Sequence, residues 1–225
     1  KTDEDNLGFT YAEVEKVARG FFDDVNPETA QKIQKKINGM SWKCKLLNLP
    51  CFVPDQKVLA IVDAQKDFID GSMGVGMEKW KKAKAAIIDL MKKEKYDSIV
   101  YTKDWHPTNH CSFKDQGGMW PSHCVAGEKG AEIDAELLAV NIPSVTLNKG
   151  CNPNVEEYGI DVLPNVDNVK ELHLVGLCFD YCVQSCAKET AKTHPNTKIV
   201  VKKAGTVAID ENAKIDWEGL NVKVE

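Results

Sequence analysis

From residue 57 onward, short apolar runs rich in β-branched residues alternate with longer stretches that carry apolar residues at helical spacing. The run from Lys57 to Val62 is apolar on both faces, as expected for a buried parallel strand. Strands that alternate with helices form a parallel sheet covered on both faces. The sequence therefore predicts an α/β fold with a doubly wound parallel sheet. The predicted strands are 57–62, 98–101, 144–147, 172–175 and 198–201, and the predicted helices are 78–94 and 181–193.

One connection is unusual for such a sheet. A parallel connection normally needs a dozen or more residues, usually a helix. Residues 155–170 offer only Val155 to Ile160 as a helix candidate before Pro164, without a clear apolar stripe. Either this crossover is irregular, or residues are missing around 159–165. The segment after residue 205 raises the same question.

Composition narrows the class of protein. A chain of 225 residues fits one sizeable domain with a small appendage, and 43% hydrophobic and 28% charged residues are ordinary for a soluble globular protein. A net charge of −5 without a basic cluster argues against a nucleic-acid partner. No apolar run reaches the length of a membrane span, so we expect no membrane partner. The sequence does not decide the oligomeric state, and a homo-oligomer is compatible with it.

The chain has eight cysteines, which are too sparse for a disulfide scaffold in a protein of this length. Most lie inside apolar stretches, where a free cysteine behaves as a small hydrophobe. We therefore expect a reducing compartment, the cytoplasm. The only pair that we consider as a disulfide is Cys44 with Cys51, in a region that looks like a loop.

Residues 1–50 differ from the rest and predict a helical N-terminal extension to a main domain of residues 51–225. Thr10 to Gly20 has an amphipathic pattern, and Asn26 with Pro27 is typical of a helix start, with a helix expected to about Asn38. The acidic segment 3–8 resembles the start of a calcium-binding EF-hand loop. Its register fails, because a leucine stands at a ligand position and Glu13 falls one residue early. Two interpretations remain, an acidic surface turn and a degenerate EF-hand remnant.

Four reactive side chains follow four of the predicted strands. Asp63, Asp104 and Lys149 come after the first three strands, and Cys182 lies in the segment that leads from the fourth strand into a helix. Ligands of open parallel sheets bind beyond the carboxyl ends of the strands. We therefore expect two carboxylates, a lysine and a cysteine to converge at one edge of the sheet.

Cys182 has a physical reason to be reactive. The dipole and unpaired N–H groups of a helix N-terminus favour a thiolate and can receive an oxyanion. A nearby lysine would lower the pKa of the thiol further, and a carboxylate could accept its proton. Two other interpretations exist, because Cys178, Cys182 and Cys186 repeat at helical spacing. They could be buried structural cysteines, or a metal site, although no fourth ligand adjoins them.

Histidines cluster near the second strand. Asp104, His106 and His110 lie close together in sequence, and His123 follows, so three of the five histidines fall within one short segment. A carboxylate with imidazoles suits zinc, manganese or iron, and an incomplete ligand set leaves positions for water or substrate. Isolated histidines are usually structural, but this clustering favours one divalent metal, with zinc ahead of manganese and iron.

Four motifs in this order resemble those of the nicotinamidases, also called pyrazinamidases, which are isochorismatase-like cysteine hydrolases. The resemblance covers roughly residues 57–205, and residues 1–50 lie outside it, although some invertebrate nicotinamidases are similar in carrying an N-terminal EF-hand-like segment. The motifs are Val62-Asp63-Ala64-Gln65-Lys66-Asp67-Phe68, Asp104-Trp105-His106-Pro107-Thr108-Asn109-His110, Trp120-Pro121-Ser122-His123-Cys124-Val125 and Gly176-Leu177-Cys178-Phe179-Asp180-Tyr181-Cys182-Val183.

The resemblance implies an isochorismatase-like fold and a cysteine amidohydrolase that converts nicotinamide to nicotinate and ammonia in NAD salvage. Asp63, Lys149 and Cys182 match the family's catalytic triad, which works through a thioester on the cysteine. Leu177-Cys178 matches a cis peptide bond before the nucleophile, and the N–H groups of Cys178 and Cys182 match the oxyanion hole.

The resemblance also implies a metal site and a substrate pocket. Asp104, His106 and His123 match metal ligands, and His110 matches a histidine that ligates directly in some members and stays behind the ligands in others. Phe68 and Trp120 match aromatic walls around the pyridine ring, whose nitrogen binds the metal. The implied substrates are nicotinamide and also pyrazinamide.

Two departures from the family pattern are notable. Position 178 usually carries a small residue such as alanine, and a thiol there could form a reversible disulfide or fill space. The family's Tyr-Ser-Ala-Phe stretch is replaced by Tyr158 followed by Gly159.

The alternative functions are that of a related amidohydrolase and that of a non-catalytic binding protein. Isochorismatases lack the cysteine, N-carbamoyl amidohydrolases lack the metal cluster, and a protein without catalysis would not need the complete triad.

Overall fold

The computed structural model describes residues 9–10, 13–14, 16–17, 24–47, 56–164, 166 and 169–225, with the backbone only for 38–47. Its centre is a six-stranded sheet with the order β3-β2-β1-β4-β5-β6, in which all neighbouring strands are parallel. This confirms the predicted fold class. The strands are β1 Gln56–Val62, β2 Ser98–Asp104, β3 Ser144–Lys149, β4 Val169–Leu177, β5 Lys198–Val207 and β6 Val222–Val224.

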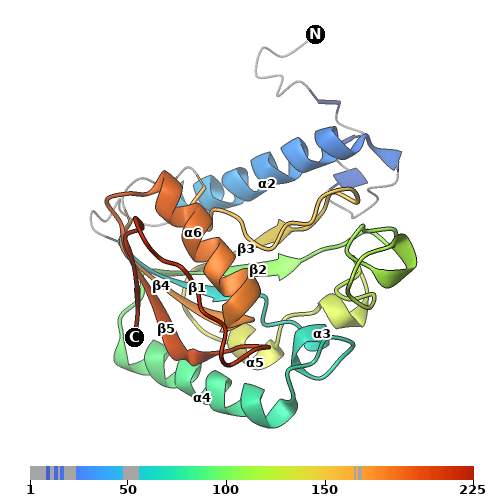
Figure 1. The fold of residues 1–225 in the computed structure, drawn as a ribbon. Helices are drawn as coiled ribbons and strands as arrows, with labels where there is room; N and C mark the ends of the chain where they lie inside the picture. Colours follow the sequence, from blue (N-terminus) through green and yellow to red (C-terminus); the bar gives the residue numbers. More distant parts are fainter. Residues whose placement is uncertain are drawn as a thin grey trace.

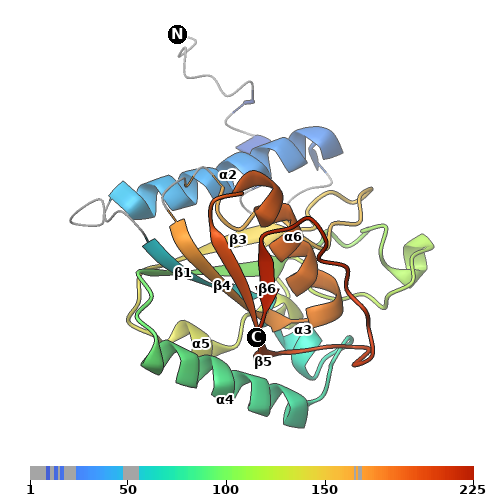
Figure 2. The same ribbon diagram turned by 60° about the vertical axis from the view of Figure 1, so that its left-hand side comes forward.

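Helices cover both faces of the sheet (Figures 1 and 2). Helix α4, Met77–Lys93, lies with the short helices α3, Lys66–Ile69, and α5, Ala135–Leu138, on one face. Helices α2, Pro27–Leu47, and α6, Gln184–Thr193, lie on the other. The chain order of strands and helices thus produces the doubly wound architecture.

The apolar pattern that predicted α4 faces the sheet. Trp80, Ala83 and Ile87 are buried, and they pack with residues of β1, β2 and β4 into one hydrophobic core. The opposite face of the sheet has its own core, which includes Val183 and Cys186. The interiors of β1 and β2 are therefore covered from both sides, as the absence of polar alternation in 57–62 indicated.

Several boundaries differ from the prediction. Strands β2 and β3 continue to Asp104 and Lys149, and β5 continues to Val207, because polar residues near a strand's end can still pair with neighbouring strands. The short strand β6 was not predicted. Helix α2 runs to Leu47, well past Asn38, so Cys44 lies in a helix and not in a loop.

The structure describes the N-terminal region only in part. Asn26 Oδ1 accepts hydrogen bonds from the N–H groups of Glu28 and Thr29, which explains where α2 begins. Residues 13–14 and 16–17 are helical, as predicted for 10–20. The EF-hand-like segment 3–8 and Cys51 lie outside the described residues. Among the described helices, none has both the length and the apolar character that crossing a membrane would require.

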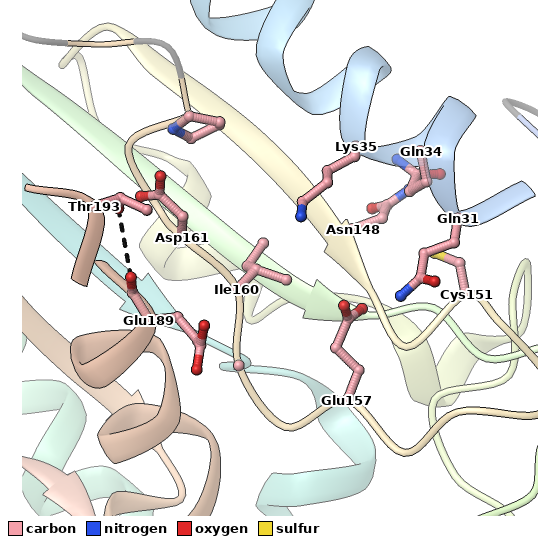
Figure 3. Close-up of a pocket in the computed structure, with 12 residues that line it drawn as sticks. Gln31, Gln34, Lys35, Asn148, Cys151, Glu157, Ile160, Asp161, Glu189 and Thr193 are labelled. Atoms are coloured by element: carbon pink, nitrogen blue, oxygen red, sulfur yellow. Dashed lines mark hydrogen bonds between the residues drawn. The ribbon is translucent and has the colours of Figure 1, made fainter. Parts of the chain in front are cut away.

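The connection from β3 to β4 is irregular. No described residue between 150 and 166 is helical, although the connection crosses from the edge strand β3 to β4 beside β1. A cavity of about 370 Å³ lies between this crossover and α2 (Figure 3). The described part of the crossover is therefore irregular, and β5 likewise continues without a helix into the segment that leads to β6.

Candidate active site

The reactive residues predicted at the strand ends lie together in the structure. Asp63 directly follows β1, whereas Asp104 and Lys149 are the last residues of β2 and β3. Cys182 lies in the π-helical turn Phe179–Val183 between β4 and α6. All four residues are buried. Oxygen atoms of Asp63 and Asp104 and the sulfur of Cys182 lie within 4.8 Å of one another.

Lys149 holds this cluster together. Its ammonium group lies 2.8 Å from Asp63 Oδ2, donates a hydrogen bond to Asp104 Oδ1, and lies 3.5 Å from Cys182 Sγ. Thr102 Oγ1 donates a 2.7 Å hydrogen bond to Asp63 Oδ1. Asp63 Oδ2, by contrast, accepts no well-directed hydrogen bond, in spite of the short distance to Lys149. Asp63 Oδ2 therefore faces Lys149, whereas Oδ1 is held by Thr102.

The two carboxylates differ in acidity. Burial raises the pKa of Asp63, and the charge of Asp104 adds to this effect against the opposing influence of Lys149. Burial also acts on Asp104, but Lys149 and His106 outweigh it and hold its pKa well below the usual range. The pKa of Lys149 is raised, because the two carboxylates outweigh the effect of burial. Asp104 thus stays ionised, whereas Asp63 is suited to take up a proton.

The surroundings of Cys182 act on the pKa of its thiol in opposite directions. Burial raises the pKa of the thiol well above its usual value, and Asp63 and Asp104 raise it further, whereas Lys149 only partly opposes them. The sequence showed the lysine and the nearby helix, which both favour a thiolate, but it did not show the degree of burial. Cys182 therefore needs a base to remove its proton.

The first motif supplies structural supports as well as Asp63. The side chain of Gln65 accepts a 2.8 Å hydrogen bond from the Asp104 N–H and donates one of 2.8 Å to the Asp104 carbonyl. Asp67 accepts a 2.7 Å hydrogen bond from the N–H of Cys124, directly after His123. The motif therefore fixes the backbone on both sides of the histidine cluster, a role that sequence reasoning did not assign.

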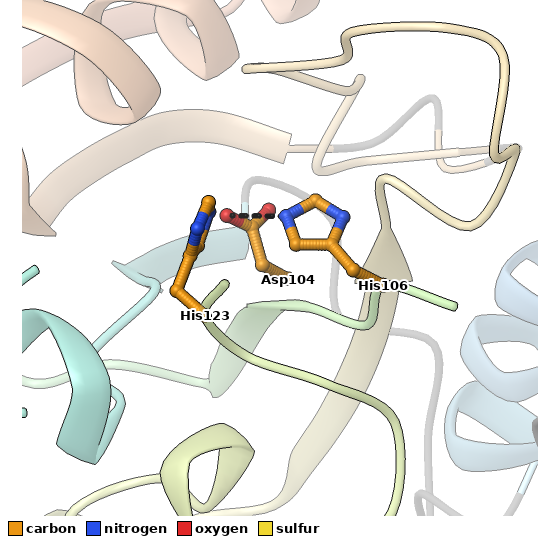
Figure 4. Close-up of side chains that lie close together, drawn as sticks. All are labelled: Asp104, His106 and His123. Atoms are coloured by element: carbon orange, nitrogen blue, oxygen red, sulfur yellow. Dashed lines mark ion pairs between the residues drawn. The ribbon is translucent and has the colours of Figure 1, made fainter. Parts of the chain in front are cut away.

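Asp104, His106 and His123 bring three candidate ligand atoms within 4.8 Å of one another. Figure 4 shows the Asp104 carboxylate between the two imidazole rings. Nδ1 of His106 donates to the Gly150 carbonyl at 2.8 Å, and Nδ1 of His123 donates to the Pro121 carbonyl at 2.8 Å. These bonds leave the Nε2 atom of each ring as the candidate ligand atom, and Nε2 of His106 lies 3.4 Å from Asp104 Oδ2. One carboxylate and two imidazoles with this orientation fit a divalent metal.

His110 lies beside this group but uses both of its ring nitrogens elsewhere. Its Nε2 is 3.1 Å from the Val155 carbonyl, and its Nδ1 is 2.7 Å from Ser112 Oγ. Its ring stacks against His106 with 4.1 Å between the ring centroids. In this conformation His110 supports His106 from behind and offers no lone pair to a metal.

A pocket opens over these residues. Its base includes Asp104, His123 and Cys182, and its walls include Phe68 and Trp120, the two aromatic residues singled out in the sequence. Phe68 lies 5.5 Å from the ring of His123, measured between centroids. The pocket therefore connects the candidate metal ligands to the cysteine along an aromatic surface.

Sequence reasoning missed two further aromatic walls. Tyr158 accepts a 3.0 Å hydrogen bond from Trp120 Nε1, and Tyr181 lies edge-on to Trp120 with 5.4 Å between centroids. Tyr158 was noted only as a departure from the family pattern. Its position inside the irregular crossover that follows β3 could have suggested a role in the pocket. Cys178 also lines the pocket, and the peptide bond between Leu177 and Cys178 is cis.

The sheet and its edge define the class of protein, a parallel α/β enzyme with its reactive groups at the carboxyl ends of the strands. The isochorismatase domain matches residues 57–213, and the chain therefore belongs to the isochorismatase family. Nicotinamidase/pyrazinamidase of Mycobacterium tuberculosis is 30% identical to this chain over 166 residues, which cover 68% of this chain and 89% of the relative.

Two solved structures extend the comparison. Pyrazinamidase of Pyrococcus horikoshii in complex with zinc is 28% identical, with a TM-score of 0.56 over 69% of this chain and 88% of that structure. PnC1 from L. infantum in complex with nicotinate is also 28% identical, with a TM-score of 0.62 over 72% of this chain and 87% of that structure. The described sheet thus agrees with the fold that the family resemblance implied.

Proposed function

We propose that this chain is a nicotinamidase, an amidohydrolase that converts nicotinamide and water to nicotinate and ammonia in NAD salvage. The observation that carries this proposal is one pocket lined by Cys182, Asp104 and His123. Directly behind this lining, Lys149 joins Asp63 to Cys182, and His106 lies with Asp104 and His123. The consistent names of the relatives support the same activity.

In the proposed reaction, Cys182 Sγ attacks the carboxamide carbon while Asp63 Oδ2 takes the thiol proton. The raised pKa of Asp63 suits it to accept this proton, and a base is needed because burial also raises the pKa of the thiol. The N–H groups of Cys178 and Cys182 stabilise the oxyanion. Asp63 then gives the proton to the departing ammonia, and water hydrolyses the thioester to release nicotinate. Throughout, Lys149 keeps Asp63 and Cys182 close together.

Phe68 and Trp120 hold the substrate ring, with Tyr158 and Tyr181 completing the walls. A divalent metal held by Asp104, His106 and His123 supplies a Lewis-acid site for the ring nitrogen. We propose zinc, with manganese or iron as alternatives, and His110 as a support for His106. Pyrazinamide, which keeps a ring nitrogen opposite the carboxamide, is a second expected substrate.

Two further assignments complete the proposal. Residues 1–50 form an extension to a hydrolase domain of residues 51–225. The cytoplasm is the proposed compartment, and it is supported by the free thiols of all the described cysteines whose side chains are placed. A related amidohydrolase that acts on another small amide remains the alternative function.

Ammonia release from nicotinamide tests the activity, with an N-carbamoyl amide as the competing substrate. Cys182→Ala should abolish turnover, whereas Cys186→Ala should keep it. Cys186 is also buried and follows Cys182 by four residues, but it does not line the pocket. Hydrolysis of the N-carbamoyl amide in preference to nicotinamide would favour the alternative. Equal loss of activity in both variants would contradict the assignment of Cys182.

A further inference from the structure

The N-terminal region shares a small hydrophobic core with the candidate metal site. Its buried members from the N-terminal region are Val17, Val25, Ala30 and Ile33. From the main domain, this core contains the buried Cys151, with the half-buried Trp105 and Ala126 packed against it. The N-terminal region therefore rests on three points of the hydrolase domain that are far apart in sequence.

All three points adjoin His106. Trp105 precedes it in the chain, and the Ala126 N–H donates a 2.8 Å hydrogen bond to the His106 carbonyl. Cys151 follows Gly150, whose carbonyl accepts the hydrogen bond from His106 Nδ1. The fit at this point is tight, because a Cβ added to Gly150 would lie 2.4 Å from the His106 ring. A shift of Cys151 or Trp105 would thus move the imidazole or its hydrogen-bond partner.

Helix α2 borders a cavity on its other flank. There it faces the irregular crossover across the cavity of about 370 Å³ (Figure 3). In the crossover, Glu157 accepts a 2.9 Å hydrogen bond from the Gly150 N–H and so holds the same glycine from the opposite side. Near His106, α2 makes the apolar contacts of the shared core and packs against β3.

We propose that the N-terminal region is a positioning element for the metal site, with Ile33 as the positioning residue that acts through Cys151 and Trp105 on His106. This inference rests on the proposed metal ligands. Ile33 is 1% exposed and lies in the first half of α2, so its side chain fills the junction between helix and hydrolase domain. Positioning partners behind a metal ligand commonly change metal affinity when they are altered.

The test compares Ile33→Ala with Ile87→Ala. Ile87 is also fully buried, but it packs from α4 on the opposite face of the sheet, so the same truncation should lower thermal stability without reaching His106. The affinity for Zn²⁺ is measured by competition with a chromogenic chelator on folded protein. We expect Ile33→Ala to weaken Zn²⁺ binding about tenfold, the lower end of the usual effect of such partners. Ile87→Ala should leave Zn²⁺ affinity unchanged.

If the alanine variants fail to fold, Ile33→Val and Ile87→Val replace them. Ile33→Val should then weaken Zn²⁺ binding by a smaller factor, and Ile87→Val should leave it unchanged. His106→Ala separates the two proposals. If His106→Ala loses Zn²⁺ while Ile33→Ala loses only thermal stability, the positioning role is wrong and the metal site stands. If His106→Ala leaves Zn²⁺ affinity unchanged, the proposed metal site is wrong and the positioning role fails with it.

Discussion

Lys149→Met should strongly destabilise the protein and abolish its activity. The lysine side chain is fully buried, as is its partner Asp63, and its ammonium group also bonds Asp104. Methionine keeps much of the volume of the side chain but removes the positive charge. Two buried carboxylates would then face each other without the cation that joins them.

The size of the effect follows from this burial. Removal of one partner from a buried ion pair costs about 3–5 kcal/mol, because the other charge stays buried without compensation. In a protein of this size, 1 kcal/mol shifts the Tm by about 2–4 °C. We therefore expect a fall in Tm of roughly 6–20 °C. Thermal unfolding should be followed by circular dichroism with a chelator present, so that no cation compensates Asp104.

A second variant tests the reason for the effect. In Asp63→Asn with Lys149→Met, a neutral amide replaces the carboxylate and can still accept the hydrogen bond from Thr102. The double variant should regain much of the lost Tm but no activity. A fall in Tm of less than about 2 °C for Lys149→Met, below the effect of 1 kcal/mol, would refute the reasoning. So would a double variant that is less stable than the single one.

Three further predictions concern binding, substrate choice and pH. Cys182→Ala should still bind nicotinamide in equilibrium dialysis, because the aromatic walls and the proposed metal ligands are unchanged; loss of binding would contradict this placement of the substrate. Benzamide, which lacks the ring nitrogen, should have a much lower kcat/KM than nicotinamide, and equal values would exclude the proposed contact of the nitrogen with the metal. Burial lowers the pKa of His173, which contacts Tyr96 and Glu171. The unfolded chain therefore protonates this histidine at a higher pH than the folded protein does. In urea unfolding, the free energy of unfolding of wild type should exceed that of His173→Gln by less as pH falls through about 6.5. An increase of this difference at lower pH would contradict the sign.

The residues that meet at the edge of the sheet could be predicted from the sequence, because their positions depend only on where the parallel strands end. Once parallel strands are recognised, the residues after them must meet at one edge, wherever the chain runs between the strands. Asp63, Asp104 and Lys149 follow from this rule alone. The catalytic roles that we assign to them stay predictions until the variants are measured.

Other features depend on contacts that no local pattern reveals. The ring nitrogens of His110 are engaged by the Val155 carbonyl and by Ser112, and only the folded crossover brings Val155 to this position. The acidity of Cys182 depends on a balance between burial and three neighbouring charges. Tyr158 reaches Trp120 from 38 residues away. In each case the relevant partner is distant in sequence, so spacing could not have identified it.

The difference between the pKa values of the two carboxylates has an electrostatic cause. Asp63 and Asp104 are both buried and both contact Lys149, so burial and this cation alone cannot separate their pKa values. Asp104 gains the difference from the imidazoles, because His106 and His123 lie beside it and favour its ionised form. Asp63 has only the Thr102 hydroxyl in their place, and the charge of Asp104 raises its pKa further. When neighbouring groups have their pKa values moved apart in this way, one can accept protons while the other stays charged. The histidines would therefore do more than bind a metal, since their position favours Asp63 over Asp104 as the proposed base.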